Sequence, residues 1–164
     1  MNVRSGIGYD SHRLADGRAL ILGGVEIEDA ELGLEGHSDA DALTHAVIDA
    51  LLGAAGLGDI GLHFPDSDER WRDADSIALL REVVSLIAGA GWSVGNVDAT
   101  LICEAPKLGP YRDRMRAALA TAVGVNPDAV NVKFTTNERM GPIGRGEGIA
   151  ALATATLSAR ANDR

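Results

Sequence analysis

The spacing of apolar residues changes between strand-like and helix-like several times along the chain, and this change constrains the fold most. Apolar residues alternate from Val3 to Tyr9, which is typical of a strand with one buried face. From Asp39 to Ala55 they recur at the spacing of one helix face, with Ser38 as the N-cap, Asp41 completing a capping box and Gly56 as the C-cap. The pattern predicts a fold that contains both strands and helices.

Further elements follow from the same criteria. Two more helices are predicted, at residues 75–88 and at residues 111–123, the latter with Pro110 at its start and Gly124 at its end. Further strands are predicted at residues 19–25, 92–103 and 130–136, and residues 149–157 suit a helix or a strand, of which we favour the strand.

These elements predict one α/β domain of the α+β kind over residues 1–164, with a core at about residues 3–158. Its two layers would be a mixed sheet of four or five strands and helices on one face of that sheet. Because three helices cannot cover both faces, the other face is expected to be available for self-association.

Charge and cysteine content narrow the function. The net charge is −9 and no basic run occurs, so a nucleic-acid-binding surface is not expected. Binding of a phosphate would need metal ions, backbone N–H groups and a few placed cations. The single cysteine excludes an intramolecular disulfide and a thiolate zinc cluster. With no signal peptide and no apolar stretch of ~20 residues, the chain is expected to be cytoplasmic and not embedded in a membrane.

The strongest candidate metal ligands are Asp10, His12 and His45. Asp10 and His12 are two apart on a strand, so both side chains leave the same face. His45, near the second turn of the first helix, would complete an Asp/His/His set that suits Zn²⁺ with one position left for substrate. The alternative is a capping aspartate beside a surface histidine.

His37 and Ser38 precede the same helix. Ser38 and the first-turn N–H groups would bind a phosphate close to the metal. Alternatively, Ser38 only caps the helix and His37 is an exposed loop residue. His63 has no paired ligand and is expected to be a surface residue.

Three later segments are also candidates for substrate binding. The carboxylates between Asp59 and Asp68 could bind the hydroxyl groups of a polyol, with the Phe64 ring forming one side of the pocket. Alternatively, they serve as turn and cap residues. Residues 105–107 lie between a strand and a helix, where a base or phosphate could be bound. Residues 135–138, with Arg145, suit a diphosphate with Mg²⁺, or form a solvated turn.

Other phosphate-binding signatures do not fit. The glycine-rich loop at residues 137–148 lacks the Lys-Ser/Thr of a P-loop and comes too late for a dinucleotide-binding motif. The metallophosphatase pattern would need Gly-Asn-His where the chain has Gly95-Asn96-Val97-Asp98, and too few ligands remain for a two-metal site.

The chain as a whole resembles the 2-C-methyl-D-erythritol 2,4-cyclodiphosphate synthase family from about Arg4 to Leu157. Six segments occur in the family's order, which makes coincidence improbable. The segments that carry the resemblance are Gly8-Tyr9-Asp10-Ser11-His12, His37-Ser38-Asp39-Ala40-Asp41 with His45, Asp59-Ile60-Gly61, Phe64-Pro65-Asp66-Ser67-Asp68, Ala105-Pro106-Lys107 and Gly144-Arg145-Gly146-Glu147-Gly148.

The resemblance implies a phosphorus-oxygen lyase of the non-mevalonate (MEP) route to isoprenoid precursors. The substrate would be 4-diphosphocytidyl-2-C-methyl-D-erythritol 2-phosphate, and the products the 2,4-cyclodiphosphate and CMP. It implies Zn²⁺ on Asp10, His12 and His45, Mg²⁺ or Mn²⁺ on Glu138 through the substrate diphosphate, and transition-state stabilisation by His37 and Thr136.

The resemblance also implies which residues bind the substrate. Those expected around the methylerythritol phosphate are Asp10, His12, His37, Ser38, Asp59, Ile60, Gly61, Phe64, Pro65, Asp66, Ser67 and Asp68. Those expected around the cytidine and the diphosphate are Cys103, Glu104, Ala105, Pro106, Lys107, Leu108, Gly109, Thr135, Thr136, Asn137, Glu138, Pro142 and Arg145.

Members of the family form homotrimers with active sites shared between subunits, so the resemblance implies a homotrimer here. Pro142 replaces an aromatic residue and Gly109 a larger apolar one that relatives often carry. Two other hypotheses remain: a zinc-stabilised nucleotide-binding module, in which the metal is structural, and a metal-dependent phosphohydrolase.

Overall fold

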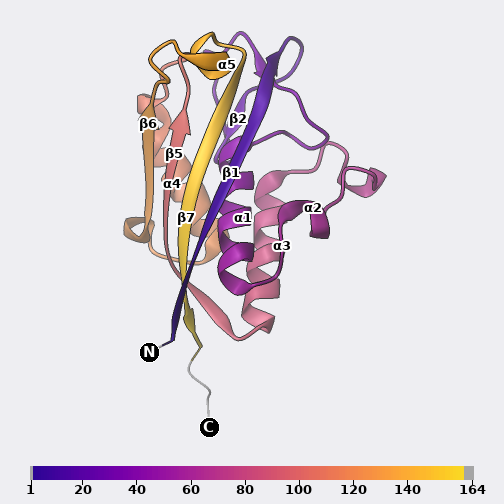
Figure 1. The fold of residues 1–164 in the computed structure, drawn as a ribbon, viewed down its shortest axis with the longest axis vertical. Coiled ribbons are helices and arrows are strands. Elements are labelled where there is room, and N and C mark those ends of the chain that lie inside the picture. Colours follow the sequence, from indigo (N-terminus) through magenta and orange to yellow (C-terminus); the bar gives the residue numbers. More distant parts are fainter. Residues whose placement is uncertain (1, 161–164) are drawn as a thin grey trace.

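The two longest strands, β1 (Val3–Ala15) and β7 (Gly148–Ala159), pair antiparallel and form the middle of the sheet (Figure 1). The computed structural model describes residues 2–160. On its other side β7 pairs antiparallel with β5 (Trp92–Ile102), which pairs in parallel with β6 (Val130–Thr135). The short β4 (Gly33–Leu34) extends β1's edge, so the order is β4-β1-β7-β5-β6. The predicted mixed sheet is confirmed, with five strands.

Three long helices, α1 (Ala42–Ala55), α3 (Ser76–Gly89) and α4 (Arg112–Val123), form the second layer (Figure 1). α1 packs on β1 and β7, α4 packs on β6, and α3 packs on α1 and α4. The core between the layers is apolar, with fully buried residues such as Leu51, Leu101 and Met115. The remaining elements are short: β2 (Ile21–Leu22), β3 (Val25–Glu26), α2 (Ile60–His63), α5 (Gly141–Gly144) and 3₁₀ turns at Glu69–Trp71, Gly109–Tyr111 and Pro127–Ala129.

Several predicted boundaries are confirmed. Gly56 and Gly124 end α1 and α4 with positive φ angles of 74° and 76°, a conformation in which glycine has no steric penalty. Residues 149–157, which suit either structure by composition, lie in β7 and alternate between exposed and buried in its second half.

Within residues 2–160, none of the helices combines the length and apolar character needed to cross a membrane.

Two predictions about strands were wrong. The apolar alternation stops at Tyr9, but the first strand continues to Ala15, so Asp10 and His12 lie well inside β1. Residues 19–25 do not form one strand: β2 and β3 make a separate two-stranded hairpin around Gly23 and Gly24, both with positive φ. The paired glycines reverse the chain instead of interrupting a strand.

The predicted starts of two helices were also wrong. Asp41, not Ser38, is the N-cap of α1, because its carboxylate accepts from Thr44 N and from the N–H groups of Gly23 and Gly24. Ser38 Oγ instead accepts from Ala40 N. Pro110 lies in a 3₁₀ turn, and α4 begins after it, at Arg112.

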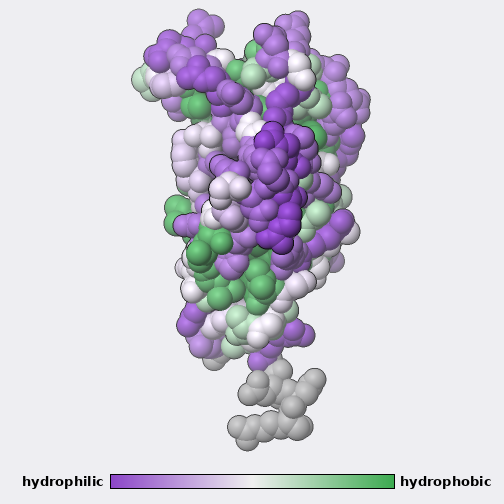
Figure 2. Space-filling model, turned by 90° about the vertical axis from the view of Figure 1, so that its right-hand side faces the viewer, coloured by the Kyte–Doolittle hydropathy of each residue, from purple (hydrophilic) through white to green (hydrophobic). Residues whose placement is uncertain are grey.

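The side of the molecule that carries α2 and α3 has hydrophilic and apolar areas next to each other (Figure 2). Leu62 on α2 and Leu86 on α3 are the large apolar side chains exposed on these two helices. The opposite face of the sheet is also uncovered, since Ile7, Tyr9 and Leu152 of β1 and β7 are 65%, 58% and 39% exposed. That open sheet face agrees with the expectation that three helices cover one side only.

Candidate active site

The position of α1 on the sheet is set by two glycines of β1. A Cβ added to Gly6 would overlap the carbonyl oxygen of Ala50, and one added to Gly8 would overlap that of Ala46. Their lack of a side chain lets the α1 backbone lie directly on β1. His45, next to Ala46 in α1, is thereby placed beside Asp10, two residues beyond Gly8.

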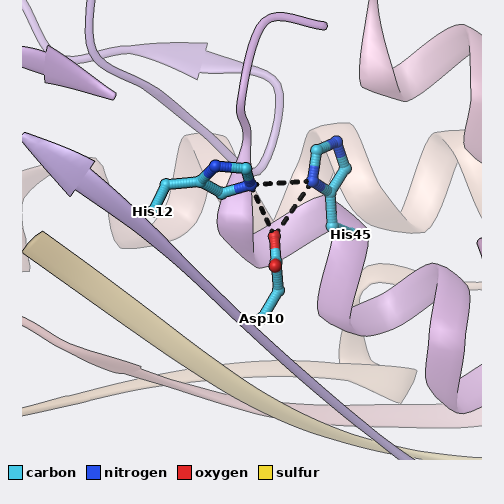
Figure 3. Close-up of side chains that lie close together, drawn as sticks. All are labelled: Asp10, His12 and His45. Carbon is cyan, nitrogen blue, oxygen red and sulfur yellow. Dashed lines mark hydrogen bonds and ion pairs between the residues drawn. The ribbon is translucent and has the colours of Figure 1, made fainter. Parts of the chain in front are cut away.

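The side chains of Asp10, His12 and His45 converge (Figure 3). Asp10 Oδ2 lies 2.8 Å from His12 Nε2 and 3.0 Å from His45 Nδ1, and the two nitrogens are 3.3 Å apart. The same-face geometry predicted for Asp10 and His12 is therefore found, and α1 supplies the third donor. Together they form a group that could hold a metal ion.

These three donor atoms suit zinc by type and by spacing. Zn²⁺ binds carboxylate oxygen and imidazole nitrogen at ~2.0–2.2 Å, and a tetrahedral arrangement separates neighbouring donors by about 3.3 Å. The observed separations of 2.8–3.3 Å require only small movements to reach that spacing. Three protein donors would leave a fourth ligand position for a group in the adjoining pocket.

The contacts in this group shift the pKa values of Asp10 and His12. Burial alone would raise the pKa of Asp10, but hydrogen bonds and charge from His12 and His45 hold it well below its usual range. Burial lowers the pKa of His12, yet the hydrogen bond and charge of Asp10 outweigh this effect, and the net pKa is raised. A bound cation would replace the proton on His12, so metal binding and protonation compete here.

The donor atoms line a pocket of about 510 Å³. His37 and Ser38 line the same pocket, although Ser38 is not at the first turn of α1. Ser38 Oγ lies 3.2 Å from His45 Nε2, so Ser38 is next to the metal site without the predicted helix N-terminus. His63 lies outside it and is half-buried, with Nε2 donating to Leu57 O at 2.8 Å, so it does not contribute to the metal site.

The segment between Asp59 and Asp68 contributes to the pocket only in part. Asp59 caps α2 by accepting from Leu62 N, and Asp68 caps a 3₁₀ turn and pairs with Arg70, roles that match the turn-and-cap alternative. Ser67 is not among the residues that line the pocket. The predicted residues of this segment that do line it are Ile60, Gly61, Phe64, Pro65 and Asp66.

A second pocket, of about 450 Å³, lies where β5 and β6 end. It brings residues 103–109, apart from Ala105, together with Thr135 and Thr136 from the next strand. Ala105 lines an adjoining pocket with Glu104 and Pro106. The second pocket shares no residue with the first, and β7 lies between β1 and β5 in the sheet.

The loop after β6 is held by Glu104. Its Oε1 accepts from Asn137 N at 2.7 Å and from Arg139 N at 3.4 Å. Thr136 Oγ1 donates to Glu138 Oε1 at 3.0 Å, so two predicted diphosphate residues are adjacent. Arg145 pairs with Glu147, and Pro142 belongs to α5 and lines a small pocket with His12.

Sequence reasoning missed Arg18. Its guanidinium donates to Gly36 O at 2.8 Å and to Ser38 O at 2.5 Å, and so holds the backbone on both sides of His37. An arginine in a turn gives no local signal of such a contact.

Trp71 was also missed: it lines the first pocket, packs edge-on against Phe64 and buries an indole N–H that has no hydrogen-bond partner among the described residues. Its position in a charged segment, Asp68-Glu69-Arg70-Trp71-Arg72-Asp73, gave no indication of this contact.

The chain is similar to proteins with assigned names over most of its length. It is 59% identical over 157 residues to the 2-C-methyl-D-erythritol 2,4-cyclodiphosphate synthase of Thermosynechococcus vestitus, covering 96% of this chain and 97% of that one. Among solved structures, the bifunctional IspDF of Campylobacter jejuni aligns with a TM-score of 0.92 and 38% identity, covering 96% of this chain and 42% of that one.

The IspF of Plasmodium falciparum in its CDP complex aligns with a TM-score of 0.85 and 32% identity, covering 98% of each chain. The YgbB family matches residues 3–158. By sequence and by fold, the chain belongs to the YgbB family, which includes the 2-C-methyl-D-erythritol 2,4-cyclodiphosphate synthases.

Proposed function

We propose that the protein converts 4-diphosphocytidyl-2-C-methyl-D-erythritol 2-phosphate to 2-C-methyl-D-erythritol 2,4-cyclodiphosphate and CMP. The observation that carries this proposal is the convergence of Asp10, His12 and His45 in a pocket that also holds His37 and Ser38. The name of the relative from Thermosynechococcus vestitus supports the identity of the reaction. The protein would thus be a phosphorus-oxygen lyase of the MEP route.

In this reaction one phosphate of the substrate attacks another phosphate of the same substrate molecule. An oxygen of the 2-phosphate forms a bond to the β-phosphorus, while the bond from that phosphorus to the oxygen bridging to the α-phosphate breaks. The bridging oxygen leaves with the electron pair as part of CMP. Because the attacking phosphate is already ionised near pH 7, the protein need supply no nucleophile and no general base.

The residues of the first pocket have positioning and charge-stabilising roles in this proposal. His37 and Ser38 would donate hydrogen bonds to the methylerythritol phosphate, and Phe64 and Ile60 would exclude water from one side. Zn²⁺ on Asp10, His12 and His45, and Mg²⁺ or Mn²⁺ near Glu138, would supply Lewis acidity toward the phosphate oxygens. Thr136, with His37, would donate to the charge that develops during transfer.

The second pocket would bind the cytidine, but from another subunit. We base this on the two pockets having no residue in common and on β7 lying between the strands that carry them. The open sheet face offers a surface for assembly, with Tyr9 and Leu152 paired across β1 and β7. A homotrimer through that face would unite a metal pocket with a neighbour's cytidine pocket.

Two alternatives are less well supported. A structural zinc in a nucleotide-binding module would be closed by four protein ligands, whereas the described residues offer a group of three. A metal-dependent phosphohydrolase would act on simple esters, and the second pocket, which suits a nucleotide, would then have no role. The expected cytoplasmic location stays a prediction of the sequence.

Phosphorus NMR of the reaction separates the three functions. Incubation of the zinc- and magnesium-loaded protein with the proposed substrate should give CMP and the cyclic diphosphate in equal amounts. Release of inorganic phosphate instead would identify a phosphohydrolase. Recovery of unchanged substrate from a protein that binds cytidine nucleotides would indicate a binding module.

A further inference from the structure

The nitrogen of His45 that points away from Asp10 and His12 (Figure 3) has partners of its own. His45 Nε2 lies 2.8 Å from Ser76 Oγ, where Ser76, the first residue of α3, is completely buried. Ser76 Oγ in turn makes a short hydrogen bond to Asp39 Oδ1, and Ser76 N donates to Asp39 Oδ2 at 2.9 Å. His45, Ser76 and Asp39 form a continuous chain that starts at the metal site.

The donors and acceptors in this series of hydrogen bonds can be assigned from the protons that each group has available. Asp39 already accepts from two backbone N–H groups, of Ser76 and of Asp41, as an ionised carboxylate does. The single hydroxyl proton of Ser76 therefore goes to Asp39, which leaves only lone pairs of Ser76 Oγ to face His45. Ser76 Oγ therefore suits a protonated His45 Nε2, and Ser38 Oγ, 3.2 Å from the same nitrogen, can accept from it as well. This is the tautomer that His45 needs in order to bind a metal through Nδ1, beside Asp10 and His12.

We propose that Asp39 and Ser76 are positioning residues that hold His45 in the Nε2–H tautomer, and so keep its Nδ1 ready to bind a metal. This inference rests on the proposed metal site and applies to the metal-bound protein, since without a cation the Asp10 carboxylate, 3.0 Å from His45 Nδ1, competes for the proton of His45. Partners behind a metal-binding histidine fix its tautomer and ring orientation, and their loss typically weakens metal binding by about 10- to 100-fold.

His12 is held in a complementary way. Its Nδ1 atom lies 2.7 Å from the carbonyl oxygen of Glu35, which can only accept, so Nδ1 carries the proton and Nε2 faces the site. The two histidines thus offer different ring nitrogens, Nε2 from β1 and Nδ1 from α1. The backbone fixes the tautomer of His12, whereas a side chain that can be replaced fixes that of His45.

The direct test uses ¹⁵N-histidine-labelled, zinc-loaded wild-type protein. Two-dimensional NMR that correlates ring nitrogens with ring protons distinguishes a protonated nitrogen from one with a lone pair. We expect His45 to have a protonated Nε2 and an unprotonated Nδ1 near pH 8. A protonated Nδ1, or a mixture of both tautomers, would overturn the proposal, and neither result depends on turnover.

The second test compares two serine variants of α3. Ser76→Ala should bind Zn²⁺ about tenfold or more weakly than the wild-type protein in competition with a chelating dye. Ser85→Ala is the matched control, because the hydroxyl of Ser85 donates to Arg81 O elsewhere on the same helix. Equal zinc affinity of Ser76→Ala and Ser85→Ala would also overturn the proposal.

Discussion

Gly8 of β1 lies directly beneath Ala46 of α1, and a side chain at Gly8 would overlap the Ala46 carbonyl oxygen and approach Ala50 N. The helix thus contacts the strand backbone to backbone, immediately beside the position where Asp10 meets His45. The geometry of the candidate metal site depends on this contact, since any added volume would move α1 away from β1.

Replacing Gly8 by alanine should therefore damage both stability and metal binding. We expect the free energy of unfolding to fall by about 3 kcal/mol, because the clash is with backbone that cannot rotate away. Zinc content should fall in parallel. Gly89→Ala is the control: Gly89 ends α3 with no atom near its would-be Cβ, so alanine should stabilise slightly. Urea denaturation and metal analysis check both, and equal stability of the two variants would contradict the proposed contact.

Asp41→Ala should be among the most destabilising substitutions in the chain. The Asp41 carboxylate is completely buried and accepts from Gly23 N, Gly24 N, Thr44 N and Thr44 Oγ1 at 2.6–2.9 Å. Its removal would leave three buried donors and the partly buried Gly24 N without an acceptor, which should lower the free energy of unfolding by about 3–5 kcal/mol.

Asp113→Ala serves as the control for that experiment. The Asp113 side chain is 92% exposed and makes one long surface ion pair with Arg116, at 3.5 Å. Surface pairs of this kind contribute little, so the unfolding curve should be almost unchanged. A similar loss in both variants would mean that the Asp41 hydrogen bonds do not stabilise the junction of β2, β3 and α1.

The spacing of apolar residues predicted most helices and strands correctly. An element buried on one face has apolar residues at every second position in a strand, or at every third or fourth position in a helix. It failed where a distant partner decides the outcome. Ser38 and Asp41 are both good N-caps by type, and the hairpin around Gly23 and Gly24 selects Asp41, since the same carboxylate serves both elements. That hairpin was itself predicted as one strand.

The candidate site shows the same limit. Asp10 and His12 were predictable as a pair from strand geometry, and His45 as a third candidate ligand from its place near the second turn of the first helix. Arg18 and Ser76 were not predictable, because each acts on its target across 18 or more residues, by a contact to a backbone carbonyl or a histidine ring that leaves no periodic signal.

Zinc binding should depend on Asp10 and His45 and should not depend on His63. Asp10→Ala and His45→Ala each remove a direct donor, so zinc affinity should fall by more than about 100-fold, beyond the cost of losing an indirect partner. His63→Ala should retain zinc, since the His63 ring donates to the Leu57 carbonyl outside the pocket. Metal analysis after gel filtration checks this, and full zinc content in His45→Ala would show that the ligand set is wrong.

Cys103 should be an unusually unreactive thiol. Burial raises its pKa to about 11, against a smaller opposite effect of the Ala105 backbone. Raising a thiol pKa favours the neutral form, so the reactive thiolate is scarce at pH 8 and should increase about tenfold per pH unit up to pH ~11. In denatured protein, with an ordinary thiol, the increase should level off near pH 9.

The pH profile of iodoacetamide alkylation measures this pKa. Because Cys103 is buried, alkylation is slowed at every pH. The raised pKa is therefore identified by how steeply the alkylation rate increases with pH, and not by the rate itself. A native profile that levels off at the same pH as that of denatured protein would contradict the raised pKa. Because Cys103 lines the second pocket, added CMP should slow the reaction further if that pocket binds the nucleotide.

A charge on the open sheet face should dissociate the proposed trimer. Leu152 of β7 pairs with Tyr9 of β1 at the middle of that face, so Leu152→Arg would put a cation inside the expected interface, where it has no partner. Leu86 on α3 is equally exposed, at 39%, but lies on the helical layer, which makes Leu86→Arg a matched control. Light scattering after gel filtration should give 51.3 kDa, three times 17.1 kDa, for wild type and Leu86→Arg, and 17.1 kDa for Leu152→Arg.

The Leu152→Arg monomer should also lose turnover, because its metal pocket and its cytidine pocket would no longer face those of a neighbour. A fully active Leu152→Arg monomer would show that one chain holds a complete active site.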